Sequence, residues 1–139
     1  MFKKTVFFFS FVVLISMAGC TPTISLYDQY AYAQAISVKV DALNLMDLAT
    51  EDYQSHQKEI AALNVEIQKI YEYDQRRTKD SLTVKQWDIL KNPNGHLLGS
   101  FLNNWKTSGK LSTVYIGDKK TTVTVAFDEI IKLENHKNK

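Results

Sequence analysis

The stretch KEIAALNVEIQKI, residues 58–70, carries the clearest helical pattern in this chain. Its isoleucines and leucine recur at steps of three and four residues, which is the spacing of one helix face. The residues on this face are Ile60, Leu63, Ile67 and Ile70. Tyr53 and His56 extend the same row toward the N-terminus. The pattern predicts a helix over residues 51–77 that packs along one side like a short coiled-coil seam.

The sequence around this seam is free of strong helix breakers. Between Pro22 and Pro93 there are 70 consecutive residues without glycine or proline. Glycine costs about 1 kcal/mol and proline about 3 kcal/mol inside a helix, so this composition favours helix throughout. A second long helix is expected over residues 25–49, with an apolar surface broad enough for more than one neighbour.

A break between the two long helices is expected near Thr50. Threonine can cap a helix, and Glu51 and Asp52 would then lie at its positive end. One continuous helix, or a later break near Ser55, remains an alternative. Two long helices joined by a short turn pack antiparallel.

A shorter helix is expected over residues 84–91, after a loop. Thr83 and Gln86 fit a capping box, and Leu82 and Trp87 fit the hydrophobic staple that accompanies it. This pattern also places Trp87 in the core.

The segment Asn92-Pro93-Asn94-Gly95 has the composition of a turn, or of an Asn cap followed by proline at the first helical position. A further helix is expected after it, and Gly109 is well placed to end that helix. The apolar residues at helical spacing are Leu97, Leu98, Phe101, Leu102 and Trp105.

The C-terminal part is ambiguous between helix and strand. Val123, Val125 and Phe127 alternate as in a β-hairpin. Val123 and Phe127 also share one helix face with Ile130 and Glu134, and we favour a helix over residues 119–134. Residues 136–139 are expected to fray. The predicted fold is therefore all-α: one domain, residues 25–135, with a long antiparallel helical hairpin packed against two or three shorter helices.

The N-terminus has the organisation of an export signal. Lys3 and Lys4 precede an almost wholly apolar run, residues 5–17, and the small pair Ala18-Gly19 follows. Thirteen apolar residues suit a signal peptide, whereas a membrane-spanning helix needs about 20. An uncleaved membrane anchor is the alternative.

The run Met17-Ala18-Gly19-Cys20 resembles the lipobox of bacterial lipoproteins, with methionine where leucine is usual. The resemblance covers residues 1–20 alone. It implies that residues 1–19 are removed, that Cys20 carries lipid and anchors the protein to a membrane, and that residues 20–24 form a tether. Thr21 stands where an aspartate would retain such a protein in the inner membrane. We therefore expect an exported protein in the outer membrane, facing the periplasm.

Charge balance argues against nucleic-acid binding. The signal contains two of the 17 basic residues and none of the 15 acidic ones, so the remainder is formally neutral. A neutral domain has no basic excess to neutralise phosphates. The only cysteine has no intramolecular partner for a disulfide.

Residues that could perform chemistry are scattered along the sequence. The three histidines lie 40 residues apart, and none has a second histidine at the spacing of a helical zinc site. His56 is expected to pack at the end of the helical hairpin. Gly95 and Gly99 lack the Gly-Lys-Ser/Thr ending of a phosphate loop, and no nucleophile elbow is present. We expect no enzymatic activity, no metal and no cofactor.

Aromatic residues give the candidate partner-binding positions. Tyr71 and Tyr73 form either a binding patch or the cover of one bundle end. Trp105 and His96 lie in a segment rich in tryptophan and asparagine, a composition that suits an interface or the closure of the bundle. We expect an accessory or scaffold lipoprotein that binds another envelope protein. The alternative is an immunity or inhibitor-type lipoprotein that neutralises a toxin or secreted effector, and a hydrolase or small-ligand carrier is a third class.

Overall fold

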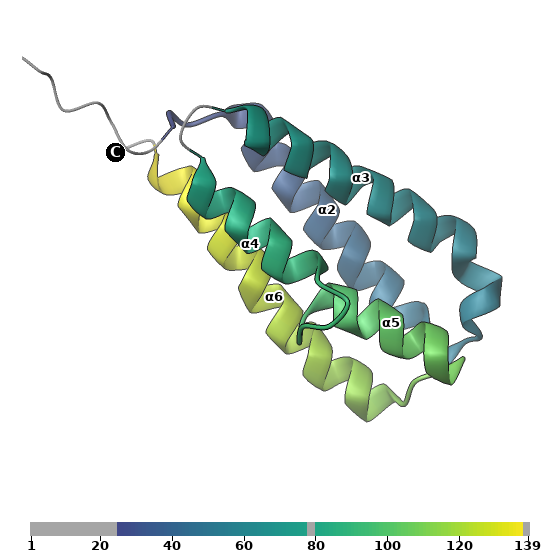
Figure 1. Ribbon diagram of the computed structural model, residues 1–139. Coiled ribbons are helices and arrows are strands. Elements are labelled where there is room, and N and C mark those ends of the chain that lie inside the picture. The colour runs from purple at the N-terminus through teal and green to yellow at the C-terminus, as the bar shows by residue number, and fades with distance from the viewer. Residues whose placement is uncertain (1–24, 78–79, 138–139) are drawn as a thin grey trace, which may run out of the picture.

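The computed structural model describes residues 25–77 and 80–137, and in these residues all regular structure is helical (Figure 1). The all-α prediction is confirmed, and the C-terminal β-hairpin alternative is wrong. The expected signal peptide, Cys20 and the tether lie outside the described residues. The α-helices are α2 (Gln29–Asp47), α3 (Gln57–Arg76), α4 (Ser81–Lys91), α5 (Leu98–Ser108) and α6 (Thr113–His136).

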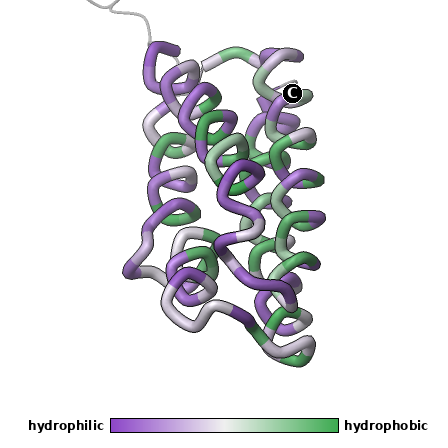
Figure 2. The backbone as a smooth tube through the Cα atoms, turned by 90° about the vertical axis from the view of Figure 1, so that its right-hand side faces the viewer, coloured by the Kyte–Doolittle hydropathy of each residue, from purple (hydrophilic) through white to green (hydrophobic). Residues whose placement is uncertain are grey.

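The helices form an antiparallel bundle with four legs, one of which is broken. α2 packs against both α3 and α6, and α4 packs against the same two helices. α5 continues the direction of α4 after a turn, so α4 and α5 together make the third leg (Figure 1). Figure 2 shows the same legs from the side, with hydrophobic positions recurring along each of them.

The core follows the predicted helix faces. All four apolar residues of the α3 seam are buried. Trp87 is also buried, and its ring packs edge-on against Phe127 of α6 with 6.1 Å between the centroids. Such aromatic pairs stabilise a core beyond the apolar area that they bury.

The turn between α2 and α3 differs in detail from the prediction. α2 ends in a 3-10 turn, Leu48–Thr50, and a second one, Tyr53–His56, leads into α3. Thr50 is not the cap; the Asp52 carboxylate accepts from Gln54 N at 2.9 Å instead. Tertiary contacts explain the difference, because Tyr53 N donates to the carbonyl of Gly109 at 2.8 Å and so ties this turn to the end of α5.

The predicted capping box before residues 84–91 is wrong. α4 begins at Ser81, with Asp80 at the N-cap position and Val84 N donating to the Asp80 carbonyl. Thr83 is buried inside the first turn and its hydroxyl donates to Asp80 Oδ1 at 3.0 Å. Leu82 is 53% exposed, so no staple forms. Asp80 and Thr83 are buried at the end of the bundle, and α4 starts at Ser81, earlier in the sequence than expected.

The two turns that flank α5 follow the prediction. Asn92 Oδ1 accepts from Asn94 N at 2.9 Å, which makes the expected turn. Gly109 ends α5 with φ of 76°, a left-handed conformation that glycine adopts without steric cost. At the start of α5, an added Cβ on Gly99 would lie 2.2 Å from the carbonyl oxygen of Lys91, so only glycine allows this close approach.

α6 is longer than expected at both ends. It begins at Thr113 with Ser112 as the cap, and Gly117 lies within it. The structure describes residues 136 and 137 of the segment 136–139 that is expected to fray. α6 reaches His136, and the side chain of Lys137 is only 3% exposed. Its ammonium group pairs with buried carboxylates, which hold the end of the helix in place.

Candidate functional site

The largest concentration of buried polar groups lies where the four legs end together. The cap residues of four helices meet here: Asp28 of α2, Arg77 of α3, Asp80 of α4 and Lys137 of α6. Asp74 and Glu134 lie three residues before Arg77 and Lys137, respectively. We call these six residues the cap cluster. The described chain also begins and ends at this end of the bundle (Figure 1).

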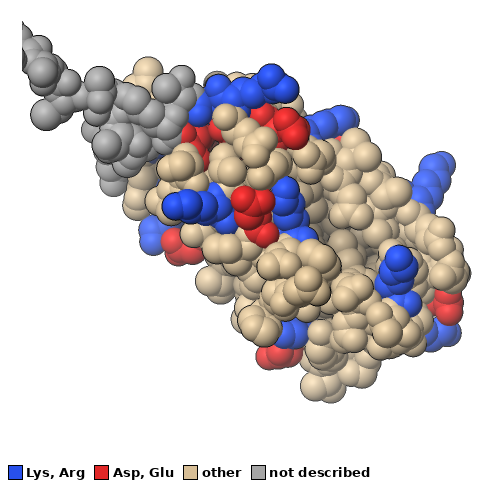
Figure 3. Space-filling model, in the orientation of Figure 1, with Lys and Arg blue, Asp and Glu red and all other residues tan. Residues whose placement is uncertain are grey.

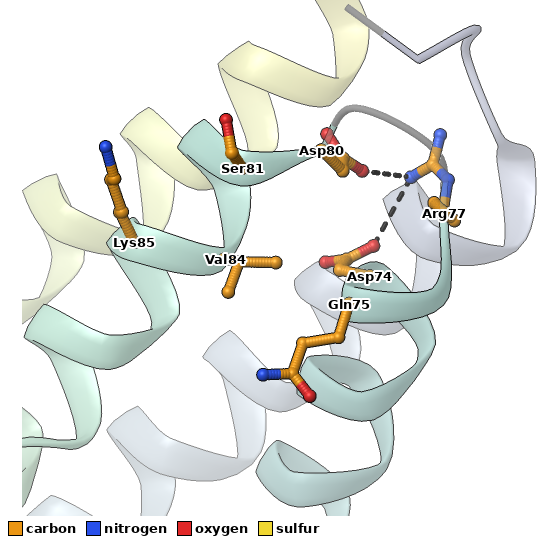
Figure 4. Close-up of a pocket in the computed structure, with 7 residues that line it drawn as sticks. All are labelled: Asp74, Gln75, Arg77, Asp80, Ser81, Val84 and Lys85. Carbon is orange, nitrogen blue, oxygen red and sulfur yellow. Dashed lines mark hydrogen bonds and ion pairs between the residues drawn. The ribbon is translucent and has the colours of Figure 1, made fainter.

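Arg77 is the centre of the cap cluster. Its Nη1 lies 2.9 Å from Glu134 Oε2, and its Nη2 lies 3.0 Å from Glu134 Oε1. The same Nη1 lies 3.0 Å from Asp80 Oδ2 and 3.3 Å from Asp74 Oδ1, and Figure 4 shows the guanidinium directed at both aspartates. A bidentate pair of this kind fixes orientation as well as distance.

Lys137 and Trp87 make further bonds to the carboxylates of the cap cluster. Lys137 Nζ lies 2.6 Å from Asp80 Oδ1 and 2.6 Å from Glu134 Oε2. The indole N–H of Trp87 donates to Asp74 Oδ2 at 2.8 Å. The cap cluster therefore bonds the ends of α3, α4 and α6 to one another and to the core.

The segment that leads into α2 is held by the same groups. Arg77 Nη2 donates to the carbonyl of Leu26 at 2.5 Å, and the backbone N–H of Asp28 donates to Glu134 Oε1 at 2.7 Å. The Tyr73 hydroxyl donates to Asp28 Oδ2 at 2.7 Å. The incoming chain is thus clamped to α3 and α6 before the first helix begins.

The pKa directions reflect this geometry. Burial raises the pKa of Asp74 above its usual value of 3.8, and the charge of Asp80 adds to the effect despite the bonds from Trp87 and Arg77. The pKa of Asp28 is lowered by hydrogen bonds from the backbone of Ala31 and from Tyr73. Burial opposes the charge of Arg77, but Glu134, Asp80 and Asp74 together outweigh burial and raise the pKa of Arg77.

An open hollow of about 380 Å³ lies beside the cap cluster, between the end of α3 and the start of α4 (Figure 4). Its lining includes Asp74, Arg77, Val84 and Lys85. In residues 25–77 and 80–137, no group of three histidine, cysteine or acidic side chains is placed to hold a metal ion. The carboxylates of Asp74, Asp80 and Glu134 are bonded to cations or to Trp87, and that of Asp28 accepts from Tyr73 and the Ala31 backbone, so the arrangement is suited to holding helix ends together.

The structure separates the four predicted partner-binding residues. Trp105 is fully buried, with its indole N–H donating to the Glu51 carbonyl at 3.0 Å, so of its two alternatives the structure supports closure of the bundle. His56 packs on the Trp105 ring at 5.7 Å, as expected for a residue at the end of the hairpin. Tyr73 bonds to Asp28 and covers the opposite end of the bundle.

Tyr71 and His96 keep accessible surface away from these contacts at the two bundle ends. Tyr71 is half-buried on α3, with Lys91 Nζ 3.2 Å from its ring centroid. His96 is exposed in the turn between α4 and α5.

The cap cluster was not predicted from the sequence, although two of its residues carry a signal for it. Glu134 falls on the same helix face as Val123, Phe127 and Ile130, where an acidic residue needs a partner. Asp74 continues the α3 seam four residues after Ile70. The cation that both of them share, Arg77, has no such periodic signal.

Comparison of this chain with protein-family models, with curated proteins and with solved structures gives no match. Within the part of the chain that the structure describes, none of the helices has the length and apolar character needed to cross a membrane.

Proposed function

We propose that this protein is a lipid-anchored component of the bacterial cell envelope with a non-enzymatic accessory or scaffold role. Its helical bundle binds another envelope protein. The observation that carries this proposal is the clamp on the incoming chain. Arg77 and Glu134 bind the backbone at Leu26 and Asp28, only six and eight residues after the cysteine of the lipobox-like run. A rigid bundle on such a short tether suits a protein that presents a binding surface from a membrane.

The polar chemistry of the bundle supports a structural rather than a catalytic role. A general acid or base must reach a substrate, and its pKa must lie near the working pH. Asp74 has a raised pKa, but it is buried and its oxygens bond to Arg77 and to the Trp87 indole. These bonds use its charge to position α3 and α4.

Tyr71 and His96 are the best candidates for contact with the partner. Lys91 covers the Tyr71 ring, and Asp88 lies 3.4 Å from the Lys91 ammonium group. Figure 3 shows basic side chains flanking acidic ones over α4, on the face that carries the turn to α5. Tyrosine is enriched at protein interfaces, whose rims are polar, and a half-buried tyrosine with polar neighbours fits this description.

The lipid anchor is tested by substitution of Cys20. Cys20→Ser should abolish incorporation of labelled palmitate and release the protein from the membrane fraction, because the serine cannot form the thioether. Met17→Leu, which restores the usual lipobox residue, is the matched control and should stay in the membrane fraction. Unchanged partitioning of Cys20→Ser would refute the anchor.

The partner surface is tested by photo-cross-linking in the native envelope. A photoreactive amino acid at position 96 should give a discrete cross-linked species that one at Ser37, exposed on α2, does not give. A species that forms only in the presence of an incoming effector would support the immunity role instead. Equal or absent cross-linking at the two positions would contradict this surface.

A further inference from the structure

The clamp on the incoming chain sets how far the bundle can stand from a membrane. This inference rests on the proposed lipid anchor at Cys20. The first clamped backbone group is the carbonyl of Leu26, six residues after Cys20. Even a fully extended chain of six residues spans at most about 20 Å. The end of the bundle with the cap cluster must therefore lie close to the lipid headgroups.

The other end of the bundle is held much farther away if the long axis stands on this end. α6 has 24 residues, so at about 1.5 Å per residue it is about 36 Å long. The turn before Thr113, at the far end of α6, would then lie beyond the headgroups by at least this length. The two ends can therefore be told apart by any probe of lipid contact.

The membrane-proximal end exposes three large hydrophobic side chains, one of which, Tyr30, also packs on Tyr73 with 4.8 Å between the ring centroids. Leu26 is 83% exposed, Leu82 is 53% exposed and Tyr30 is 50% exposed. Leu26 precedes α2, while Tyr30 and Leu82 are the second residues of α2 and α4. We call these three residues, together with Arg76 at the end of α3, the tip surface. Single exposed apolar residues are ordinary, but here three occupy the end from which the tether leaves.

At this end the buried acidic groups are paired with the buried cations Arg77 and Lys137, while a further cation faces outward. The acidic groups Asp74, Asp80 and Glu134 are buried in the cap cluster. Arg76, the last residue of α3, points outward with its side chain 82% exposed, and its nearest acidic partner, Glu72, is 3.9 Å away. A cationic side chain next to apolar ones is the combination that binds the headgroup region of an anionic bilayer.

We propose that the tip surface docks on the lipid bilayer itself. Leu26 and Leu82 enter the boundary between headgroups and acyl chains, Tyr30 lies at headgroup level, and Arg76 pairs with lipid phosphate. The lipid on Cys20 supplies the affinity, and the tip surface supplies the orientation. The clamp joins the entering chain to α3 and α6, so docking of the tip holds the whole bundle upright on the bilayer. In this orientation Tyr71 and His96 lie on the sides of the bundle, where a partner protein can reach them.

Site-specific quenching in vesicles tests this orientation. Full-length protein in its lipidated form is reconstituted into phosphatidylethanolamine and phosphatidylglycerol vesicles that contain nitroxide-labelled lipid. A fluorophore is attached through Ser81→Cys at the tip or through Ser112→Cys at the far end, both exposed positions. Quenching at position 81 should exceed quenching at position 112 severalfold.

Matched variants separate docking from anchoring. Leu26→Gln combined with Leu82→Gln should remove most of the difference in quenching while the protein still sediments with the vesicles. Val114→Gln, which changes a residue 82% exposed at the far end, should leave the difference intact. Vesicle-bound protein with equal quenching at both positions would overturn the docking of the tip and leave the lipid anchor standing. Protein that does not sediment with vesicles lacks the anchor, and both proposals would then be wrong.

Discussion

Arg77 and Glu134 face each other as a bidentate pair, with 2.9 Å between Nη1 and Oε2 and 3.0 Å between Nη2 and Oε1. They lie 57 residues apart in sequence, and the pair joins the end of α3 to the last turn of α6. Asp80 and Lys137 complete the connection to α4. Buried ion pairs do not always stabilise a fold relative to apolar residues, but removal of one partner leaves an uncompensated charge.

Glu134→Gln should strongly destabilise the bundle. The substitution leaves Arg77 and Lys137 with one fewer anionic partner in a buried site, and such a loss costs about 3 kcal/mol. Urea unfolding followed by circular dichroism measures the change. Glu129→Gln is the control: Glu129 lies on the same helix, is 55% exposed and pairs with Lys132 at 3.6 Å. Glu129→Gln should lower the free energy of unfolding by less than about 0.5 kcal/mol. An equally small loss for Glu134→Gln would show that the cap cluster is dispensable.

Asp74→Asn should alter how stability depends on pH. Because the pKa of Asp74 is raised in the folded state, its contribution to stability is greatest below the unfolded value of 3.8 and is lost as pH rises through the folded pKa. Asparagine cannot lose a proton but can still accept the bond from Trp87. The free energy of unfolding of the variant, minus that of the wild type, should therefore rise as pH increases from the unfolded pKa of 3.8 through the raised folded pKa. A difference that falls with pH would contradict the raised pKa.

Asp28 should show the opposite dependence on pH. Its pKa is lowered, so its stabilising contribution is present above 3.8 and is lost as pH falls through the folded pKa. Asp28→Ala removes the N-cap of α2 and the acceptor for Tyr73, and it should cost about 1 kcal/mol or more at neutral pH. The deficit should shrink in acid. Asp28→Asn retains a good capping side chain and should cost less, and an equal loss for the two variants would argue against capping by this residue.

Gly99→Ala and Gly117→Ala should change stability in opposite directions. A Cβ at Gly99 would lie 2.2 Å from the Lys91 carbonyl oxygen, so the contact between α4 and α5 must open, at a cost of about 3 kcal/mol. A Cβ at Gly117 meets nothing within 4 Å, and alanine there should stabilise α6 by about 0.5–1 kcal/mol. Thermal unfolding of the two variants measures both effects, and a stable Gly99→Ala protein would refute the close approach.

The sequence by itself determined the elements that depend on local chemistry. Breaker-free composition and three-four spacing specified the α3 seam, since these patterns act within one helix. Asn92 marked the turn before α5 because its side chain can accept a bond from the backbone two residues on. Gly109 marked the end of α5 because glycine adopts a positive φ without steric cost. The acidic residue Glu134 on an apolar face was a local sign of a buried partner.

Only the tertiary structure decided where several elements begin and which residues are accessible. The start of α4 moved from the expected capping box to Asp80 because Asp80 is buried and pairs with Arg77 and Lys137, partners that local sequence does not identify. Trp105 is enclosed because its indole bonds to a carbonyl 54 residues away. The cap cluster exists only when four helix ends meet, since its charges become stable in a buried site through their mutual pairing.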